Sequence, residues 1–349
     1  MQRSLKGLIE QLETEHTLSQ VEFVYLLNNY QPKTAQYLFA KARQTRERVY
    51  GSQVFIRGLL EISNVCQNDC LYCGIRKSNS KAVRYTLDLE TILDCCRQGH
   101  QLGFRTFVLQ GGENPTVFTD ELLEEIIQTL KKEFPDSAVT LSLGERSRDS
   151  YQRLFEAGAD RYLLRHETAN PQHYAQLHPE TMSWFNRINC LQNLKEIGYQ
   201  VGCGFMVGSP GQTAQHLAED LRFIANFKPH MVGIGPFIPH DSTPLAGEKP
   251  GNLELTLFLL GLIRLIQPDV LLPSTTALAT IDPEGRKLGM LAGANVVMPN
   301  ISPAEARRNY ALYNNQAEEP AERLAALKAE MQSIGLEVVI DRGDFCPEK

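Results

Sequence analysis

The sequence lacks the features that mark several common classes of protein. Its 349 residues carry a net charge of -6 and contain no basic run or arm, so the usual electrostatic footprint for nucleic acid or an anionic membrane is missing. The longest uncharged apolar run, Leu255 to Ile263, is far shorter than a membrane span, and the first residues lack a secretory apolar region. We therefore expect a cytoplasmic protein whose partners are small molecules or proteins, with no nucleic acid and no membrane among them.

A disulfide framework is also not expected, because the eight cysteines are spread over a long chain of intracellular character. Three of them stand together in NVCQNDCLYCG, where Cys66, Cys70 and Cys73 follow an apolar, strand-like run with the spacing C-x3-C-x2-C. Three thiolates on one loop can ligate three irons of a [4Fe-4S] cluster and leave the fourth iron open to a small molecule. A structural zinc site, which needs a fourth ligand, and plain buried thiols are the alternatives.

Strand-like apolar runs alternate with helical segments from Val54 onward. Eight such runs begin at residues 54, 106, 138, 161, 200, 230, 269 and 294. This alternation predicts a parallel sheet, and eight repeats predict its closure into an α/β fold of the (β/α)8 TIM barrel type; an open, doubly wound sheet is the alternative. The expected organisation is an N-terminal helical extension over residues 1–50, the barrel over 51–313, and a C-terminal helix and tail over 314–349, in which EVVIDRGD is a candidate for one extra strand.

The predicted strands end in glycine, polar or charged residues, and in a TIM barrel these carboxyl ends form the active face. The second strand ends in QGGE, residues 110–113, where two glycines allow a ligand to approach the backbone and Glu113 can accept bonds from an ammonium group. On the third strand, Thr140 and Ser142 alternate with apolar residues, so both should point into the barrel. For Thr140, a satisfied core hydroxyl is an equal alternative to a ligand contact.

Two further strand ends carry candidate ligand-binding residues. In RHETANP, Arg165 and Glu167 lie on the same side of the fourth strand, and they either pair with one another or contact ligands. After the seventh strand, the adjacent hydroxyls of Thr275 and Thr276 can hold an anion at the barrel mouth. Tyr313 can close the cavity, although tyrosines at such positions more often serve packing.

The cysteine spacing, with the aromatic Tyr72 before its last cysteine, resembles the signature of radical S-adenosylmethionine (SAM) enzymes, and QGGE resembles the GGE motif of that superfamily. This resemblance implies a [4Fe-4S] cluster and SAM as cofactors. It places Arg187, in WFNRINCL, as a clamp for the SAM carboxylate; an exposed helix arginine is the other interpretation. We expect SAM to contact Tyr72, Gly111, Gly112, Glu113, Ser142, Glu167 and Arg187.

Longer motifs, above all HETANP and GIGPFIPH, resemble one family of the superfamily, the [FeFe]-hydrogenase maturase E proteins, from about residue 50 to 313. The resemblance implies reductive cleavage of SAM to a 5′-deoxyadenosyl radical that acts on a cysteine-bound iron carbonyl/cyanide precursor during assembly of the hydrogenase active site, the H-cluster. It also implies a ferredoxin- or flavodoxin-type electron donor and other hydrogenase maturases as partners. The small organometallic or amino-acid-derived substrate is expected to contact Thr140, Arg165, Thr275, Thr276 and Tyr313. An amino-acid mutase like methylornithine synthase and a non-catalytic iron-sulfur carrier are the alternatives.

The remaining cysteines separate this chain from many members of that family. Those members carry three extra cysteines near the C-terminus for an auxiliary cluster, whereas residues 314–344 contain none and Cys346 stands alone. One cluster of about four irons is therefore expected. Cys95, Cys96, Cys190 and Cys203 lie in helix or strand patterns, and we interpret them as buried thiols.

Overall fold

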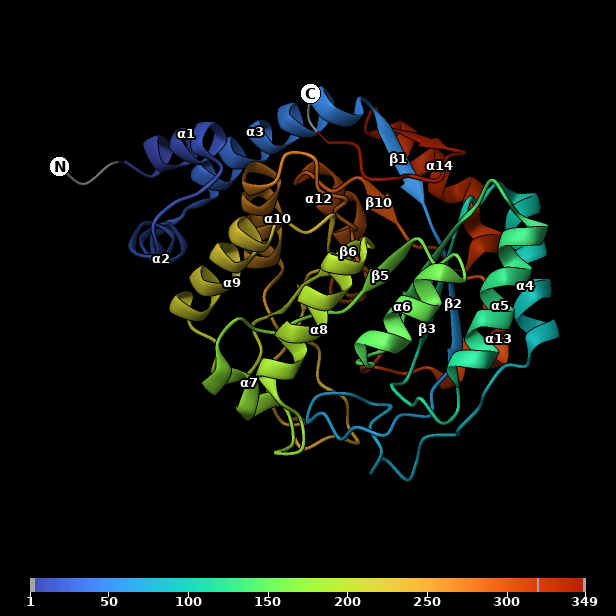
Figure 1. The fold of residues 1–349 in the computed structure, drawn as a ribbon. Coiled ribbons are helices and arrows are strands. Elements are labelled where there is room, and N and C mark those ends of the chain that lie inside the picture. Colours follow the sequence, from blue (N-terminus) through green and yellow to red (C-terminus); the bar gives the residue numbers. More distant parts are fainter. Residues whose placement is uncertain (1–3, 319, 348–349) are drawn as a thin grey trace.

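The computed structural model describes residues 4–318 and 320–347, so residues 1–3 of the predicted N-terminal extension and residues 319, 348 and 349 of the predicted C-terminal segment lie outside the described residues. Figure 1 shows strands at the centre of the molecule with helices around them. The first fifty residues form α1 (Leu5–Glu15), α2 (Gln20–Asn29) and α3 (Pro32–Tyr50).

The strands are β1 (Gln53–Ile56), β2 (Gly58–Ser63), β3 (Thr106–Gly111), β4 (Ala138–Ser142), β5 (Arg161–Leu163), β6 (Gln200–Cys203), β7 (Met206–Val207), β8 (Met231–Val232), β9 (Gly235–Pro236), β10 (Val296–Val297) and β11 (Glu337–Val339). The helices after α3 are α4 (Leu89–Leu102), α5 (Asp120–Glu133), α6 (Arg148–Glu156), α7 (Pro171–Leu177), α8 (Trp184–Ile197), α9 (Ala214–Phe227), α10 (Leu253–Ile266), α11 (Thr276–Ile281), α12 (Gly285–Leu291), α13 (Ala304–Asn309) and α14 (Leu324–Ser333), with a 3-10 turn at Ala321–Arg323.

The parallel sheet has six strands in the order β2-β3-β4-β5-β6-β8, which confirms the α/β, TIM-barrel-like architecture. The first predicted strand is split: β1 leads into β2 through Arg57 and pairs with β10 and with the extra C-terminal strand β11. Single parallel bridges then link β8 to Leu271 and Pro273 to β10. The regular sheet thus covers six strands, and the predicted closure into an eight-stranded barrel is not confirmed.

The seventh predicted strand, from residue 269, is wrong as a regular strand. It contributes only the bridges of Leu271 and Pro273. Pro273 has no backbone N–H to donate to a ladder. The Leu272 N–H donates instead to the side-chain oxygen of Asn295, at 2.9 Å. The Leu271 and Ser274 N–H groups still donate to the carbonyls of His230 and Val296, each at 3.0 Å, so the segment keeps part of its sheet pairing while a side-chain contact takes one position of the ladder.

Helix α10 joins the N-terminal helices to the barrel. Eleven of its fourteen residues are buried, because its outer side is covered by α3. Tyr30 stacks on Phe258 with ring centroids 4.1 Å apart, and a Cβ at Gly261 would lie only 2.9 Å from Leu38. Figure 1 shows α1 and α3 alongside α10, with α2 next to α9. The extension thus packs on one side of the barrel.

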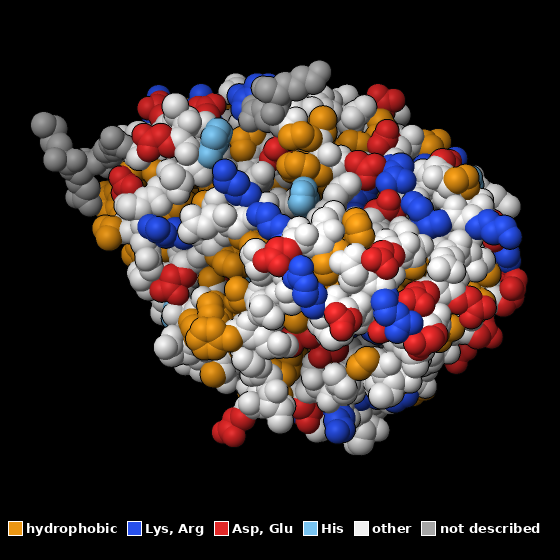
Figure 2. All heavy atoms as spheres, viewed as in Figure 1, with side chains coloured by type: hydrophobic (Ala, Val, Ile, Leu, Met, Phe, Trp, Pro, Cys, Tyr) orange, Lys and Arg blue, Asp and Glu red, His pale blue; other side chains and the backbone are white. Residues whose placement is uncertain are grey.

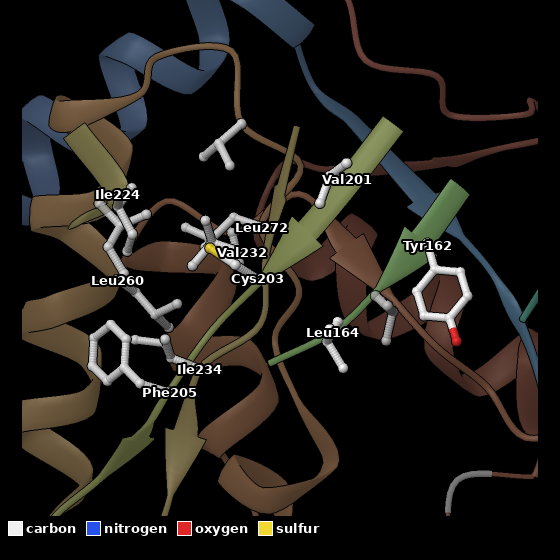
Figure 3. Close-up of a cluster of buried hydrophobic side chains, with 14 of the residues drawn as sticks. Tyr162, Leu164, Val201, Cys203, Phe205, Ile224, Val232, Ile234, Leu260 and Leu272 are labelled. Atoms are coloured by element: carbon white, nitrogen blue, oxygen red, sulfur yellow. The ribbon is translucent and has the colours of Figure 1, made fainter. Parts of the chain in front are cut away.

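The apolar core fills the layer between the strands and the surrounding helices. In Figure 3, Cys203, Val232 and Leu272 from the wall meet Ile224 of α9 and Leu260 of α10. Cys95, Cys96, Cys190 and Cys203 are buried free thiols, as predicted. Figure 2 shows acidic and basic side chains interspersed over the visible face. Among the described residues, no helix is long and apolar enough to cross a membrane.

The C-terminal tail covers the barrel at the end where the strands begin. Arg161, at the start of β5, is 0% exposed and donates to the Arg342 carbonyl at 2.8 Å and to an Asp344 carboxylate oxygen at 2.6 Å. It also donates to the Thr106 hydroxyl at 2.9 Å. Burial by itself raises the pKa of Asp344, but its contacts with Arg342 and Arg161 outweigh this and hold that pKa below its ordinary value. The tail therefore supplies the anion that a buried guanidinium requires.

We expect Asp344→Asn to lower the free energy of unfolding by about 1–2 kcal/mol, because Arg161 loses its charged partner while Asp344 itself is partly exposed and solvent-screened. Since the folded-state pKa of Asp344 is depressed, the loss should be complete above the ordinary carboxyl pKa of about 3.9 and should shrink as the pH falls below it. Urea unfolding between pH 7 and pH 3 measures this. The exposed Glu337→Gln on β11 is the control, and equal effects of the two changes would contradict the role of the tail.

Candidate active site

One cavity of about 340 Å³ lies inside the barrel at the carboxyl ends of the strands. Every predicted site residue except Thr140 lines it: Cys66, Cys70, Tyr72, Cys73, Gly111, Gly112, Glu113, Ser142, Arg165, Glu167, Arg187, Thr275, Thr276 and Tyr313. The outermost of these residues, Cys66 and Tyr313, are 247 positions apart in the chain, and parallel strand pairing is what brings the segments to the same end.

The cysteine loop follows β2 and is held mainly by Arg84. Its guanidinium donates to the carbonyls of Asn64 and Ile75 at 2.6 and 2.8 Å, and to that of Arg76 at 2.6 Å. A second anchor is Gly74, whose N–H donates to the Leu312 carbonyl at 2.8 Å and where a Cβ would meet the Ala311 carbonyl oxygen at 2.2 Å. The loop is thus tied both to itself and to the segment after α13.

The three thiols have the number of ligands that a [4Fe-4S] cluster with one open iron requires. All three are free and half-buried, and burial, together with the neighbouring thiols, raises the pKa values of Cys70 and Cys73, the latter to about 12. Within the part of the chain that the structure describes, no three Cys, His, Asp or Glu side chains gather around one metal ion. A [4Fe-4S] cluster takes one thiolate per iron at separate corners, and its positive irons offset the cost of crowding thiolates.

The GGE turn packs directly against this loop. The Gly112 N–H donates to the Ser63 carbonyl at 2.9 Å, and the Gln67 N–H donates to the Glu113 carbonyl at 2.9 Å. A Cβ on Gly112 would lie 2.6 Å from the Val65 carbonyl oxygen and 2.9 Å from Cys66 Cβ. Glycine is therefore required at 112 by the closeness of the cysteine loop, independently of any ligand.

We expect Gly112→Ala to lower the iron content of the reconstituted protein severely, because the added methyl group must displace the backbone before Cys66. Gly247→Ala is the matched control, since a Cβ there meets nothing within 4 Å. Iron and sulfide analysis, with the visible absorption of the cluster, measures both variants. Full iron content in Gly112→Ala would show that the loop is not held as described.

The backbone at Glu167 is held in an unusual conformation. Glu167 has φ +64°, the left-handed region that non-glycine residues rarely adopt. Its N–H donates to the Gly204 carbonyl at 3.0 Å, and the Gly204 N–H donates to His166 Nδ1 at 3.3 Å. The other ring nitrogen of His166 therefore carries the proton and donates to Asp220 at 3.2 Å. The buried pair of His166 with Asp220 of α9 thus holds in place the strand end that presents Glu167 to the cavity.

Arg165 and Glu167 do pair, which was one of the two sequence interpretations. Arg165 Nη2 lies 3.2 Å from Glu167 Oε2, but the angle does not make a hydrogen bond. Arg165 Nε and Nη2 and Glu167 Oε2 are consequently buried without hydrogen-bond partners. Such groups are costly to leave unsatisfied, so the pair retains donors and an acceptor for a ligand.

Arg187 is buried rather than an exposed helix residue. It lies on α8, and it donates to a carboxylate oxygen of Glu145 at 2.6 Å and to the Arg165 carbonyl at 3.0 Å. The backbone N–H of Glu145 donates in turn to a Glu113 carboxylate oxygen at 2.8 Å. One chain of contacts therefore joins Arg187, Glu145 and the GGE turn. Sequence reasoning missed Glu145, although it directly follows the third strand end, where polar residues were expected.

Tyr72 is fixed by a neutral histidine. Its hydroxyl lies 3.2 Å from His178 Nε2, while His178 Nδ1 lies 2.9 Å from the Tyr174 carbonyl, to which it donates. Burial lowers the pKa of His178 to about 3, so the ring accepts the tyrosine hydroxyl hydrogen. His178 and the nearby Met182, whose sulfur lies 3.7 Å from Cys70 Sγ, gave no sequence pattern that pointed to the site.

The predicted substrate residues are only partly brought together. Thr140 lies on the same side of β4 as Ser142 but two residues deeper; it is 1% exposed, lacks a hydrogen-bond partner and does not line the cavity. Thr140 is therefore a core residue, as the alternative expected, but its hydroxyl is not satisfied there as that alternative required. Thr275 donates to the Ile234 carbonyl at 3.2 Å and precedes α11, which starts at Thr276. Tyr313 lines this cavity and a second one of about 310 Å³ beside it.

Comparison with known proteins agrees with this geometry. The Radical SAM superfamily model matches residues 60–224. The [FeFe] hydrogenase maturase subunit HydE of Thermotoga maritima is 49% identical, over 79% of this chain and 78% of the relative. The 3-methylornithine synthase of Methanosarcina barkeri is 28% identical over 86% and 84%. The crystal structure of methylornithine synthase (PylB) shares the fold, with a TM-score of 0.83 and 24% identity over 95% of this chain and 97% of that one.

A cysteine loop that opens onto a cavity at the carboxyl ends of parallel strands, beside a GGE turn, defines a radical SAM enzyme, as the superfamily match also shows. Within that class, the 49% identity to HydE identifies the family. The chain belongs to the HydE family of [FeFe] hydrogenase maturases.

Proposed function

We propose that this protein acts in [FeFe] hydrogenase maturation as a SAM-cleaving enzyme on a small, cysteine-bound iron carbonyl/cyanide precursor. The observation that carries the proposal is the 49% identity to a HydE protein, combined with a single cavity lined by the cysteines and the GGE turn. When bound, a reduced [4Fe-4S] cluster and SAM supply methionine and a 5′-deoxyadenosyl radical. The electron comes from a ferredoxin- or flavodoxin-type donor in the cytoplasm, and the precursor and product pass between this protein and other maturases.

The chain's own residues divide into two sets around the cavity. Cys66, Cys70 and Cys73 hold the cluster. Glu113 and Glu167 accept the SAM ammonium group, and Arg187 donates to its carboxylate once it leaves Glu145. Tyr72, Gly111, Gly112 and Ser142 complete the SAM wall. Arg165, Thr275, Thr276 and Tyr313 face the substrate, with Arg165 supplying the positive charge for an anionic group.

Cys70→Ala should abolish the cluster, while Cys96→Ala should leave about four irons per chain, because only the first thiol faces the cavity. Anaerobic reconstitution followed by iron and sulfide counts measures both. A count near six or eight in the unchanged protein would contradict the single cluster, and loss of iron in both variants would show that the ligands are misassigned.

Arg165→Met should keep the cluster and slow, uncoupled formation of 5′-deoxyadenosine but lose hydrogenase maturation. Arg187→Met should weaken SAM binding about ten- to a hundredfold, which corresponds to about 1.5–3 kcal/mol for a charge-assisted contact. SAM affinity is read from the EPR spectrum of the reduced cluster, beside a maturation assay. If Arg165→Met weakens SAM binding as much as Arg187→Met, the division of the cavity is wrong.

A second candidate function is amino-acid mutase activity, favoured by the 28% identity to 3-methylornithine synthase and by the shared fold. Incubation of the reconstituted protein with SAM, reductant and L-lysine separates the two candidates. Formation of a carbon-skeleton isomer of lysine would support the mutase, whereas maturation of a hydrogenase without such an isomer supports the maturase.

A further inference from the structure

Glu61 is a charged-type residue in the middle of an apolar strand, and the functions assigned above do not use it. It lies on β2 between Leu60 and Ile62, which are 0% exposed and pack in the core. Glu61 itself is 1% exposed but points the other way, because it lines both the 340 Å³ cavity and the adjoining 310 Å³ cavity. Strand pairing places it level with Gln110 and Ser142, which line the larger cavity too.

The carboxyl group of Glu61 is only half satisfied. One contact comes from the side chain of Asn300, while Oε2 is buried without a hydrogen-bond partner. The Glu61 N–H donates to the Ser302 hydroxyl at 2.8 Å, and the Tyr85 hydroxyl donates to the Glu61 carbonyl at 2.9 Å. Both hydroxyls therefore bond to the backbone of Glu61. An unpartnered carboxylate oxygen in a cavity wall is costly unless a ligand satisfies it.

The other acids that line the larger cavity already have partners. Glu113 accepts the Glu145 N–H at 2.8 Å, and Glu167 pairs with Arg165 at 3.2 Å. The nearest cation to Glu61, Arg307 on α13, donates to the Ser302 carbonyl at 2.8 Å and lies 3.6 Å from Glu322. Glu167 Oε2 also lacks a hydrogen-bond partner, but the function proposed above assigns it to the SAM ammonium group. Among the described lining residues, Glu61 is thus the acid with an unpartnered oxygen that no role assigned above uses.

We propose that Glu61 accepts the ammonium group of an amino-acid-derived substrate, so that the cavity recognises a zwitterion. Arg165 and the threonines hold the anionic group, as in the function proposed above on which this inference rests, and Glu61 holds the cationic group from β2. The substrate class is therefore a compound with a free α-amino and α-carboxylate group.

The protonation state of Glu61 is consistent with this role. Burial raises the pKa of Glu61 to about 8, against smaller lowering effects of Asn300 and Arg307; Tyr85 and Tyr310 are the other titratable groups that face it. The free carboxyl therefore holds a proton more readily than an ordinary glutamate, and an ammonium group beside it favours the ionised form. Binding of the zwitterion should release a proton, which calorimetry in two buffers of different ionisation enthalpy detects.

The test uses two ligands that differ only in the ammonium group, S-methyl-L-cysteine and 3-(methylthio)propionate, with the reconstituted, SAM-loaded enzyme. The unchanged protein should bind the amino acid about ten- to a hundredfold more tightly than the propionate, the range for a charge-assisted contact. In Glu61→Gln this preference should fall to within about threefold, and proton release should disappear, because the amide cannot ionise. Binding of the propionate should stay unchanged.

A control variant and separate activity measurements test whether Glu61 itself recognises the ammonium group. Glu305→Gln, on the exposed face of α13, makes the same chemical change outside the cavity and should keep the preference. A retained preference in Glu61→Gln, an equal loss of both ligands, or no preference in the unchanged protein would each overturn the role of Glu61. Iron content and 5′-deoxyadenosine formation report on the proposed function separately, and Glu305→Gln should leave both unchanged.

Discussion

Three thiols crowded on one loop are the constraint on which the rest of this structure depends. Buried thiols next to one another resist ionisation, so the loop that carries Cys66, Cys70 and Cys73 must be held by other contacts when no iron compensates. Arg84 binds three of its carbonyls, Gly74 packs under the segment after α13, and Gly112 allows the GGE turn to touch it. Backbone contacts therefore help to shape the site.

The polar groups around the cavity hold one another in the same way. Arg187 pairs with Glu145, Arg165 pairs with Glu167, and His166 pairs with Asp220. Each pair limits the cost of placing charge in a barrel, and the incomplete geometry of the Arg165–Glu167 pair keeps bonding capacity for ligands. A ligand that carries both charges can exchange with these internal partners without leaving a buried charge alone.

At the opposite end of the barrel, where the strands begin, a buried charge is also paired, although no catalytic role is assigned there. There the buried Arg161 receives its anion from the C-terminal tail, and β11 adds itself to β1. The tail thus acts as a structural cover, and its one cysteine among the described residues, Cys346, is exposed.

The sequence by itself determined the order of strands and helices, the cysteine loop, and which strand ends carry polar residues. Period-two alternation and C-x3-C-x2-C spacing are local properties, so they need no knowledge of distant partners. It also pointed correctly to fourteen cavity-lining residues, though only the resemblance to a family assigned their roles. Only the tertiary structure decided the depth of each side chain along the barrel axis, because register between strands depends on packing over the whole sheet. That is why Thr140 lies below the cavity, why the segment at Pro273 pairs only through single bridges, and why Glu61, within an apolar run, faces the site.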